Sequence, residues 1–304
     1  MKHFLSVHDV GDINALVQQA LQFKQAPLQQ QQAGKGKRLG LLFLNPSMRT
    51  RISTQVSALN LGMEPLVFNI GPEGWALEFG EGVAMNGTTV EHVKDAAPVL
   101  GQYFDLLGIR TFPALQNREQ DYSEQVIHAF VQYSGVPVIS LESATLHPLQ
   151  SLADLLTIQE HWFGSNKHFA HINNSIENFN DQQLQTPNPQ RQTSKPKIVL
   201  SWAPHVKALP QCVANSFAQW ITAWGEADFV VTHPKGFELK EEFTQGATIV
   251  HDQQEALQGA DFVYVKNWSA YQEYGKILSG HEEWMLTPKH LAQTNDAAVM
   301  HCLP

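Results

Sequence analysis

The segment Ser47-Met48-Arg49-Thr50-Arg51 combines hydroxyl and guanidinium side chains in a pattern typical of an anion-binding site. An apolar run over residues 39–44 precedes it and predicts a buried strand, and a helical pattern over residues 50–61 follows it. The first turn of a helix offers free backbone N–H groups and the positive end of the helix dipole, and both stabilise an anion. The hydroxyls and guanidiniums would add charge-assisted donors. An equally weighted alternative is an N-cap serine followed by two solvated arginines.

Three other candidate positions stand where predicted strands end. Arg110 follows a strand over residues 105–109, and His301-Cys302-Leu303-Pro304 follows a strand over residues 298–301. His147-Pro148-Leu149-Gln150 opens a helical pattern, and His147 could donate a hydrogen bond to a carbonyl oxygen of a ligand. Ligands of open α/β sheets gather at the carboxyl ends of strands, so we expect these groups to meet there. An exposed loop arginine and a structural histidine are the plain alternatives.

Cys302 beside His301 could act as a nucleophilic thiol with the histidine as its base. We do not favour this hypothesis, because the nearby sequence has no carboxylate to orient the histidine. Backbone carbonyls in this turn could instead hold an amine. None of the 14 histidines falls in a His-x-x-x-His arrangement and no Cys-x-x-Cys occurs, so we expect no metal. There is no Gly-x-Gly-x-x-Gly after a strand and no Walker lysine motif, which argues against a dinucleotide, a nucleoside triphosphate and a Rossmann dehydrogenase. We therefore expect no cofactor.

Composition narrows the class of protein. The 304 residues are 43% apolar and 16% charged, which fits a globular enzyme of two domains. The net charge of −9, without a cluster of basic residues, argues against a nucleic-acid partner. No apolar run approaches the roughly 18 residues of a membrane span, and no signal-peptide core occurs. With only two, distant cysteines, we expect a cytoplasmic protein that does not enter a membrane.

Alternating strand and helix patterns predict the elements that must position these residues. We expect an α/β protein with two doubly wound parallel-sheet domains, joined by a linking helix over residues 147–161, and an active site in the cleft between them. The domains are predicted at residues 1–147 and 148–304. Residues 165–195 are dense in Asn, Gln, Ser and Pro and predict an inserted flexible loop without chemistry. The remaining predicted strands are 65–70, 136–140, 197–202, 228–232, 247–250 and 261–265, and the remaining predicted helices are 91–103 and 123–133.

In this order and spacing, Ser47-Met48-Arg49-Thr50-Arg51, Arg110, His147-Pro148-Leu149-Gln150 and His301-Cys302-Leu303-Pro304 resemble the motifs of the carbamoyltransferase family. The last motif resembles the ornithine side of the family rather than the aspartate side, which carries His-Pro-Leu-Pro. The Ser-Met-Gly sequence of enzymes for free ornithine is missing. Over residues 1–304, apart from the inserted loop, the chain is similar instead to the transcarbamylases of N-acylated ornithine. The features that carry this likeness are Gly74-Trp75, Glu142 ahead of His147, Trp202-Ala203-Pro204-His205 and Lys266-Asn267-Trp268.

Two acylornithine branches exist, one for the acetyl and one for the succinyl group. The stretch Trp202-Ala203-Pro204-His205 through Asn215-Ser216-Phe217-Ala218 resembles the succinyl branch. Before Glu91-His92 the acetyl branch has glutamate and the succinyl branch has proline, whereas this chain has Val90. Valine lacks the carboxylate that would repel the distal carboxylate of a succinyl group. The resemblance thus favours N-succinylornithine, with N-acetylornithine as the alternative.

The resemblance also implies roles for individual residues. Arg110, His147 and Cys302 would be catalytic, with Arg110 and His147 polarising the carbamoyl oxygen. Trp75 would reach in from a neighbouring subunit of a homotrimer. Carbamoyl phosphate would be held by Ser47, Met48, Arg49, Thr50, Trp75, Arg110, His147, Gln150, Cys302 and Leu303. The acylornithine would be engaged by Glu142, His205, Lys266 and Val90.

Family members continue past His-Cys-Leu-Pro with an arginine-bearing segment and a further helix, whereas this sequence stops at Pro304. We therefore expect an incomplete product or record of a longer protein. The alternative from a different class is a non-catalytic binder that still holds carbamoyl phosphate or another phosphate but has lost turnover.

Overall fold

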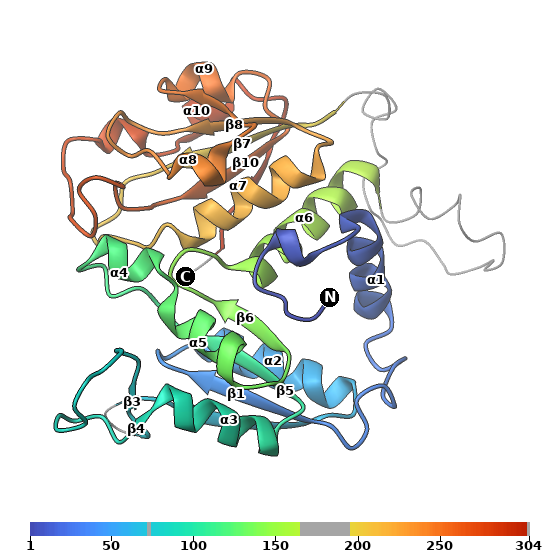
Figure 1. Cartoon of the computed structure of the whole chain (residues 1–304). Helices are drawn as coiled ribbons and strands as arrows, with labels where there is room; N and C mark the ends of the chain where they lie inside the picture. Colours follow the sequence, from blue (N-terminus) through green and yellow to red (C-terminus); the bar gives the residue numbers. More distant parts are fainter. Residues whose placement is uncertain (72–73, 165–194, 303–304) are drawn as a thin grey trace.

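Two main parallel sheets organise the part of the chain that the computed structural model describes, residues 1–71, 74–164 and 195–302 (Figure 1). The first sheet has the order β2-β1-β5-β6 and the second the order β11-β10-β7-β8-β9. All strand pairs in both sheets are parallel, so the predicted α/β class is confirmed. The strands are β1 (Arg38–Phe43), β2 (Glu64–Asn69), β5 (Leu106–Arg110), β6 (Val138–Glu142), β7 (Lys197–Trp202), β8 (Asp228–Thr232), β9 (Thr248–Val250), β10 (Phe262–Lys266) and β11 (Ala298–Met300).

Helices and short elements connect these strands. Two short parallel strands, β3 (Leu77–Glu78) and β4 (Glu91–His92), form a small third sheet. The helices are α1 (Ile13–Gln25), α2 (Met48–Asn60), α3 (Val93–Tyr103), α4 (Arg118–Tyr122), α5 (Gln125–Tyr133), α6 (Pro148–Phe163), α7 (Cys212–Trp224), α8 (Glu241–Thr244), α9 (Gln253–Leu257) and α10 (Pro288–Leu291), with 3-10 turns η1 (Val7–Asp9) and η3 (Glu282–Trp284).

The first sheet is covered on both faces because successive side chains of a strand point to opposite sides. Leu41 and Phe43 of β1 pack in one cluster with Ala58 of α2. Leu42, between them, packs in another cluster with residues of α3 and α5. A parallel strand that is buried on both faces is apolar throughout, and this is the run that the sequence shows at β1.

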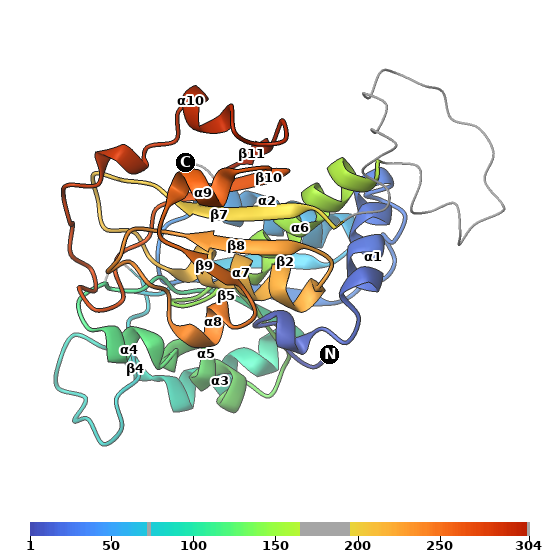
Figure 2. The ribbon, with the colours of Figure 1, turned by 90° about the horizontal axis from the view of Figure 1, so that it is seen from above.

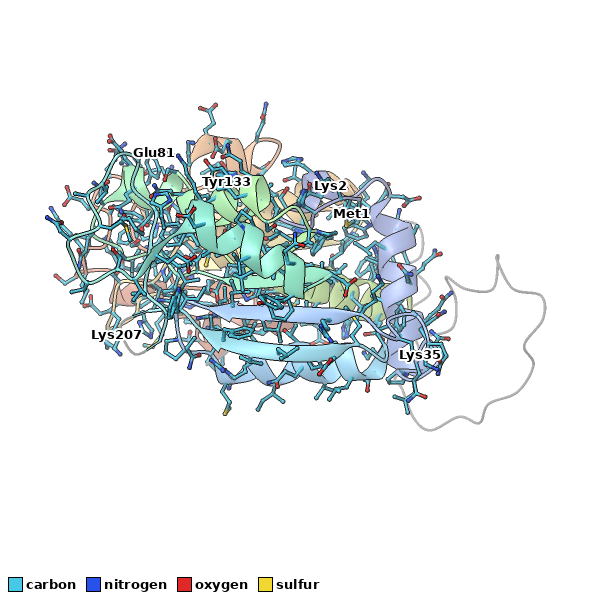
Figure 3. All side chains as sticks on the ribbon, turned by 60° about the horizontal axis from the view of Figure 1, so that its bottom comes forward. Met1, Lys2, Lys35, Glu81, Tyr133 and Lys207 are labelled. Atoms are coloured by element: carbon cyan, nitrogen blue, oxygen red, sulfur yellow. The ribbon has the colours of Figure 1, made fainter. Side chains whose placement is uncertain are left out.

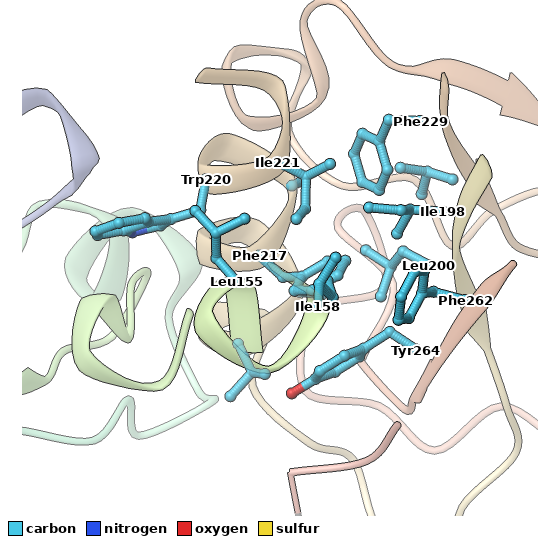
Figure 4. Packing of buried hydrophobic residues seen from close by; sticks show 14 of the residues in the cluster. Leu155, Ile158, Ile198, Leu200, Phe217, Trp220, Ile221, Phe229, Phe262 and Tyr264 are labelled. Atoms are coloured by element: carbon cyan, nitrogen blue, oxygen red, sulfur yellow. The ribbon is translucent and has the colours of Figure 1, made fainter. Parts of the chain in front are cut away.

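The second sheet carries the largest core of the molecule, which Figure 4 shows from close by. Ile198 and Leu200 of β7 face the helices α6 and α7, where Ile158 and Phe217 meet them. Val199 points to the other face, into a cluster with residues of α9. The core of the second sheet therefore extends into α6, the helix that follows the first sheet.

The helix α6 joins the two sheets, as the sequence predicts for residues 147–161. His147 is its N-cap residue and Pro148 occupies the first turn, where the missing N–H of proline costs no helical hydrogen bond. In Figures 1 and 2, α1 lies alongside α6, and Val17 and Leu21 of α1 belong to the core of the second sheet. The domain division at residue 147 stays a prediction, because the core that includes α6 also holds residues from the N-terminal segment.

Several expectations differ from the structure. The helices α1, α4 and α7 and the short helices α8, α9 and α10 were not predicted. The apolar residues Ile52 and Val56 indicated α2 by their spacing, but both are exposed rather than buried in this chain. The predicted insertion, apart from Lys195, lies outside the described residues. No described helix has the length and apolarity required to cross a membrane.

Candidate active site

The predicted anion site lies at the N-terminus of α2. Ser47 is the N-cap, and its hydroxyl accepts from the backbone N–H of Thr50 and donates to the Thr50 hydroxyl at 2.9 Å. The side chains of Met48 and Arg49 point to solvent. Arg51 turns away instead, because its guanidinium stacks on the ring of Phe43, 4.5 Å away, and donates to Asn69 at 2.6 Å. Only the first of the two motif arginines is therefore available to an anion.

Arg110 and Glu142 form a buried ion pair beside this helix end. They are cross-strand neighbours at the ends of β5 and β6, where an irregularity in the register follows Ile109. The nitrogen Nη2 of Arg110 lies 2.7 Å from Oε2 of Glu142, and both side chains are about a tenth exposed. Nη1 of Arg110 donates to the backbone oxygen of Pro46 at 3.1 Å, directly ahead of Ser47. The pair thus links the strand ends to the anion site.

His147 lies against the same carboxylate, with Nε2 3.8 Å from Oε2 of Glu142. Its other ring nitrogen, Nδ1, is buried without a hydrogen-bond partner among the described residues. Burial lowers the pKa of His147, and the positive charges of Arg110 and Lys266 lower it further, against the opposite effect of Glu142. A neutral imidazole with one unused nitrogen can bind a ligand oxygen or proton at this position.

The second sheet contributes cations from its own strand ends. Lys266, the last residue of β10, is 9% exposed, and none of the ion pairs in the described parts of the chain includes it. His205, in the loop after β7, is exposed and pairs with the backbone of Lys207. Burial lowers the pKa of His301, and so do the charges of Lys266 and His205. Lys266 and His205 therefore both lie close enough to His301 for their charges to act on its imidazole.

Gln150 and Cys302 meet a buried polar group that the sequence analysis did not single out. Gln150 donates from Nε2 to Oδ1 of Asp154, one turn further along α6, at 2.9 Å. Burial raises the pKa of the Tyr264 hydroxyl, and the neighbouring Asp154 carboxyl and Cys302 thiol raise it further. Asp154, which Gln150 contacts, and Cys302 therefore both lie near the Tyr264 hydroxyl. Leu303 lies outside the described residues.

Trp75 and Val90 lie together at the small third sheet, and both side chains are about half exposed. The indole N–H of Trp75 donates to the carboxylate of Glu91 at 2.7 Å, and the backbone N–H of Val90 donates to the oxygen of Ala76. Among the described residues, the hydrogen bonds and ion pairs of Arg110 and His147 include neither of these side chains.

The loop between Trp75 and Val90 is tied to α3. Glu81 pairs with Lys94 of α3 at 2.5 Å, and Lys94 also lies over the ring of Tyr133. Figure 3 labels Glu81 and Tyr133 on this face. Two of the site's predicted residues therefore stand on an exposed, anchored loop.

Two further residues at the site were missed. Asn45, in the loop after β1, accepts from the backbone N–H of Phe112 at 2.6 Å and so ties the loops after β1 and β5 together. Cys212, at the start of α7, contacts Oε1 of Glu142 at 3.4 Å, and burial raises the pKa of its thiol. An asparagine between a strand and a helix start is a weak signal for the first, and only the tertiary fold reveals the second. In the described ranges, no three His, Cys, Asp or Glu side chains come together in a way that could hold a metal ion.

Comparisons with known proteins show which proteins this chain is similar to. Residues 2–160 match the family described as "Aspartate/ornithine carbamoyltransferase, carbamoyl-P binding domain", and residues 211–304 match the family described as "Aspartate/ornithine carbamoyltransferase, Asp/Orn binding domain". The N-succinylornithine carbamoyltransferase of Bacteroides thetaiotaomicron is 42% identical over all of this chain and 87% of its own length. The N-acetylornithine carbamoyltransferase of Xanthomonas campestris is 34% identical, with the same coverage.

Solved structures show the same likeness. The crystal structure of N-acetyl-L-ornithine transcarbamylase matches with a TM-score of 0.83 and 33% identity, over 100% of this chain and 88% of the other. A variant of that enzyme with one glutamate replaced by valine, complexed with carbamyl phosphate and N-succinyl-L-norvaline, matches with a TM-score of 0.82 and 33% identity, over 100% of this chain and 89% of the other.

Proposed function

The chain belongs to the aspartate/ornithine carbamoyltransferase family, and we propose that it transfers the carbamoyl group of carbamoyl phosphate to the side-chain amine of N-succinyl-L-ornithine. The products would be N-succinyl-L-citrulline and phosphate, in arginine biosynthesis. One observation carries the proposal: a buried group of Arg110, Glu142, His147 and Lys266 gathers where the strand ends of both sheets adjoin the N-terminus of α2. Residues 1–147 would bind carbamoyl phosphate and residues 148–304 the acylornithine.

The phosphate would bind at the N-terminus of α2. Backbone N–H groups of the first turn, including those of Met48 and Arg49, are donors that an α-helix does not use itself. The hydroxyls of Ser47 and Thr50 and the solvent-facing guanidinium of Arg49 supply further donors. These groups would donate hydrogen bonds to a doubly charged phosphate. The cation among them, Arg49, is exposed to solvent rather than buried.

The transfer itself would proceed through a tetrahedral intermediate. The neutral side-chain amine of the ornithine attacks the carbamoyl carbon, the C–N bond forms, and the carbonyl oxygen takes the negative charge. Arg110 and His147, with its unused ring nitrogen, would stabilise that oxyanion. The C–O bond to phosphate then breaks, and the leaving phosphate accepts the proton of the attacking amine. Most of the acceleration would come from positioning and electrostatic stabilisation.

Residues of both sheets would complete the binding of the substrates. The buried ammonium of Lys266 suits a carboxylate of the acceptor, because a buried cation is stabilised by an anion that reaches it. Glu142 and His205 would engage the acylornithine as well. Gln150, Cys302 and Leu303 would close around the carbamoyl end of carbamoyl phosphate.

Val90 supports succinyl rather than acetyl as the acyl group. Its side chain is apolar and half-exposed beside Trp75 and Glu91, so it adds no charge of its own against a distal carboxylate. A structural relative of this chain, an acetylornithine enzyme with valine in place of a glutamate, was crystallised with N-succinyl-L-norvaline. The higher identity to N-succinylornithine enzymes points the same way.

We also propose that the protein is a cytoplasmic homotrimer, in which Trp75 reaches the active site of a neighbouring subunit. The exposed position of Trp75 supports this. So does α2, where the side chains of Met48, Ile52, Val56 and Leu59 form an exposed apolar stripe beside the anion site. Such a stripe on a helix is typical of a surface that another chain covers.

The test is carbamoyl transfer by the purified chain, given carbamoyl phosphate with ornithine, N-acetylornithine and N-succinylornithine in parallel. We expect a citrulline product from the succinyl compound alone. A His147→Gln protein prepared identically controls for contaminating activity and is expected to form no product. Product from the acetyl compound alone would overturn the assignment of the acyl group. Tight binding of a phosphonate analogue of carbamoyl phosphate without any product would favour the non-catalytic binder.

A further inference from the structure

A tight turn over residues 143–146 connects Glu142 to His147. The backbone N–H of Ser143 donates to the oxygen of Leu146 at 2.8 Å, and the backbone N–H of Leu146 donates to the hydroxyl of Ser143 at 3.1 Å. Ser143, Ala144 and Thr145 are all buried. The conformation of this turn therefore determines how Glu142 and His147 lie relative to each other.

The carboxylate of Glu124 holds this turn from outside. Its Oε1 accepts from the backbone N–H of Thr145 at 2.7 Å, from the Thr145 hydroxyl at 2.5 Å and from the Ser143 hydroxyl at 2.6 Å. Its Oε2 accepts from the backbone N–H of Ala144 at 3.3 Å. A carboxylate can accept at about four lone-pair sites, so this one carboxylate can accept all four of these hydrogen bonds from the turn.

The backbone of Glu124 is itself constrained. It adopts the left-handed conformation with φ 49° and ψ 32°, which is unfavourable for a residue other than glycine. Glu124 is also the N-cap residue of α5, yet its side chain makes no capping hydrogen bond to that helix. The Glu124 side chain accepts hydrogen bonds from the 143–146 turn rather than from the first turn of α5. Such strain persists where the surrounding contacts compensate for it, here the bonds to the 143–146 turn.

The 143–146 turn also contacts α7, a helix that packs on the second sheet. The oxygen of Thr145 accepts from the side-chain amide of Asn215, on α7, at 3.2 Å. Glu124 and Asn215 thus hold Thr145 from opposite elements. A turn held in this way has little freedom to change the orientation of the residues at its ends.

We propose that Glu124 is a positioning residue, which holds the 143–146 turn and thereby fixes Glu142 and His147 for carbamoyl transfer. This inference rests on the proposed function. Glu124 is not itself at the reacting atoms. It acts through the residues at the two ends of the turn.

The test compares Glu124→Ala, Glu124→Gln and Thr145→Val with an Asp252→Ala control. Asp252 accepts two backbone N–H bonds at the start of α9, away from the site, so its loss destabilises the chain without loosening the turn. Steady-state kinetics are measured at a temperature where circular dichroism shows every variant folded. We expect Glu124→Ala to lower kcat on the order of 10²-fold, with a smaller change in the KM for carbamoyl phosphate.

Glu124→Gln and Thr145→Val also test the role of Glu124 if Glu124→Ala fails to fold. Glu124→Gln retains one oxygen acceptor for Thr145 but places an amide NH₂, which is a donor, opposite the backbone N–H of Ala144, so we expect a partial loss of kcat. Thr145→Val removes one donor and should lower kcat in the same direction. Wild-type kcat in the folded Glu124 variants, or an equal fall in Asp252→Ala, would overturn the proposal.

A second measurement does not depend on turnover. Burial lowers the pKa of His147, which is faced by Glu142, Arg110 and Lys266. If the turn loosens, water reaches the ring, and an NMR titration of His147 should move toward the ordinary histidine pKa in Glu124→Ala but not in Asp252→Ala. An unchanged titration contradicts the positioning role. A shifted titration in a protein that transfers no carbamoyl group contradicts the proposed function alone.

Discussion

The buried carboxyl of Asp154 gives the structure a measurable dependence of stability on pH. Asp154 lies on α6 and is 6% exposed, with one hydrogen bond from Gln150 to its Oδ1. Burial raises the pKa of Asp154 to about 7, against a smaller lowering by Gln150 and Tyr264. A carboxyl that must ionise inside an apolar core destabilises the folded state, since the unfolded chain ionises it in water.

The sign and size follow from the two pKa values. The folded chain keeps the proton of Asp154 up to about pH 7, whereas the unfolded chain releases it near pH 4, so stability falls as pH rises between these values. Each unit of difference corresponds to about 1.4 kcal/mol, so the span from pH 5 to pH 7 costs about 3 kcal/mol. Asp154→Asn removes this cost, and its amide oxygen can still accept from Gln150. Relative to the wild type, the variant should therefore gain about 3 kcal/mol between pH 5 and pH 8.

Urea unfolding of both proteins at pH 5 and pH 8 measures this difference directly. Asp105→Asn is a suitable control, because the hydrogen bond and charge of Lys37 lower the pKa of Asp105 at the surface. Stability from that carboxylate is lost only as pH falls below the ordinary aspartate pKa of about 4, so the control should show almost no change between pH 5 and pH 8. If Asp154→Asn shows the same difference from the wild type at pH 5 and pH 8, Asp154 ionises normally in the folded chain and the argument from burial is wrong.

Three further predictions concern the proposed site. Arg49→Ala should weaken the binding of carbamoyl phosphate by about 10²-fold in calorimetry. The control Arg51→Ala should bind nearly as the wild type does, because the Arg51 guanidinium already contacts Phe43 and Asn69. Equal losses in the two variants would refute the anion site. Val90→Glu should shift the ratio of kcat/KM from the succinyl toward the acetyl substrate by about tenfold or more, and an unchanged ratio would mean that position 90 does not contact the acyl group. Val56→Lys, on the exposed stripe of α2, should reduce the mass measured by light scattering from a trimer to a monomer, and a trimer that persists would exclude this stripe from the interface.

The sequence predicted the strands well because a parallel strand buried on both faces is a short apolar run between turns. The bounds of β7 and β8 agree with the prediction to the residue. It failed for α7, since that helix is buried except for a narrow face of Gln219, Thr222 and Ala223, which gives the sequence few polar positions to mark the helical period. The exposed stripe of α2 is the opposite case, where the period is right but the single chain offers nothing to cover it.

At the site, the sequence could predict residue types but not their partners. The motif around Ser47 and the position of Arg110 at a strand end follow from local patterns. The ion pair of Arg110 with Glu142 depends on the register of β5 against β6, which no local pattern specifies. The contacts of Glu124 with the 143–146 turn depend in the same way on how α5 packs against β6. Long-range packing thus determines which of the predicted groups are paired before a ligand binds.

This pairing gives the site a definite charge. Arg110 has a buried anion in Glu142, and His147 is kept neutral by burial, so among the described residues only Lys266 remains as a buried cation outside any ion pair. Together with the solvent-facing guanidinium of Arg49, the site therefore carries an excess of positive charge on both sides. A phosphate ester on the side of α2 and a carboxylate on the side of β10 would each meet a cation without displacing the Arg110–Glu142 pair. Two anionic substrates can then be bound close together, although they repel each other in water.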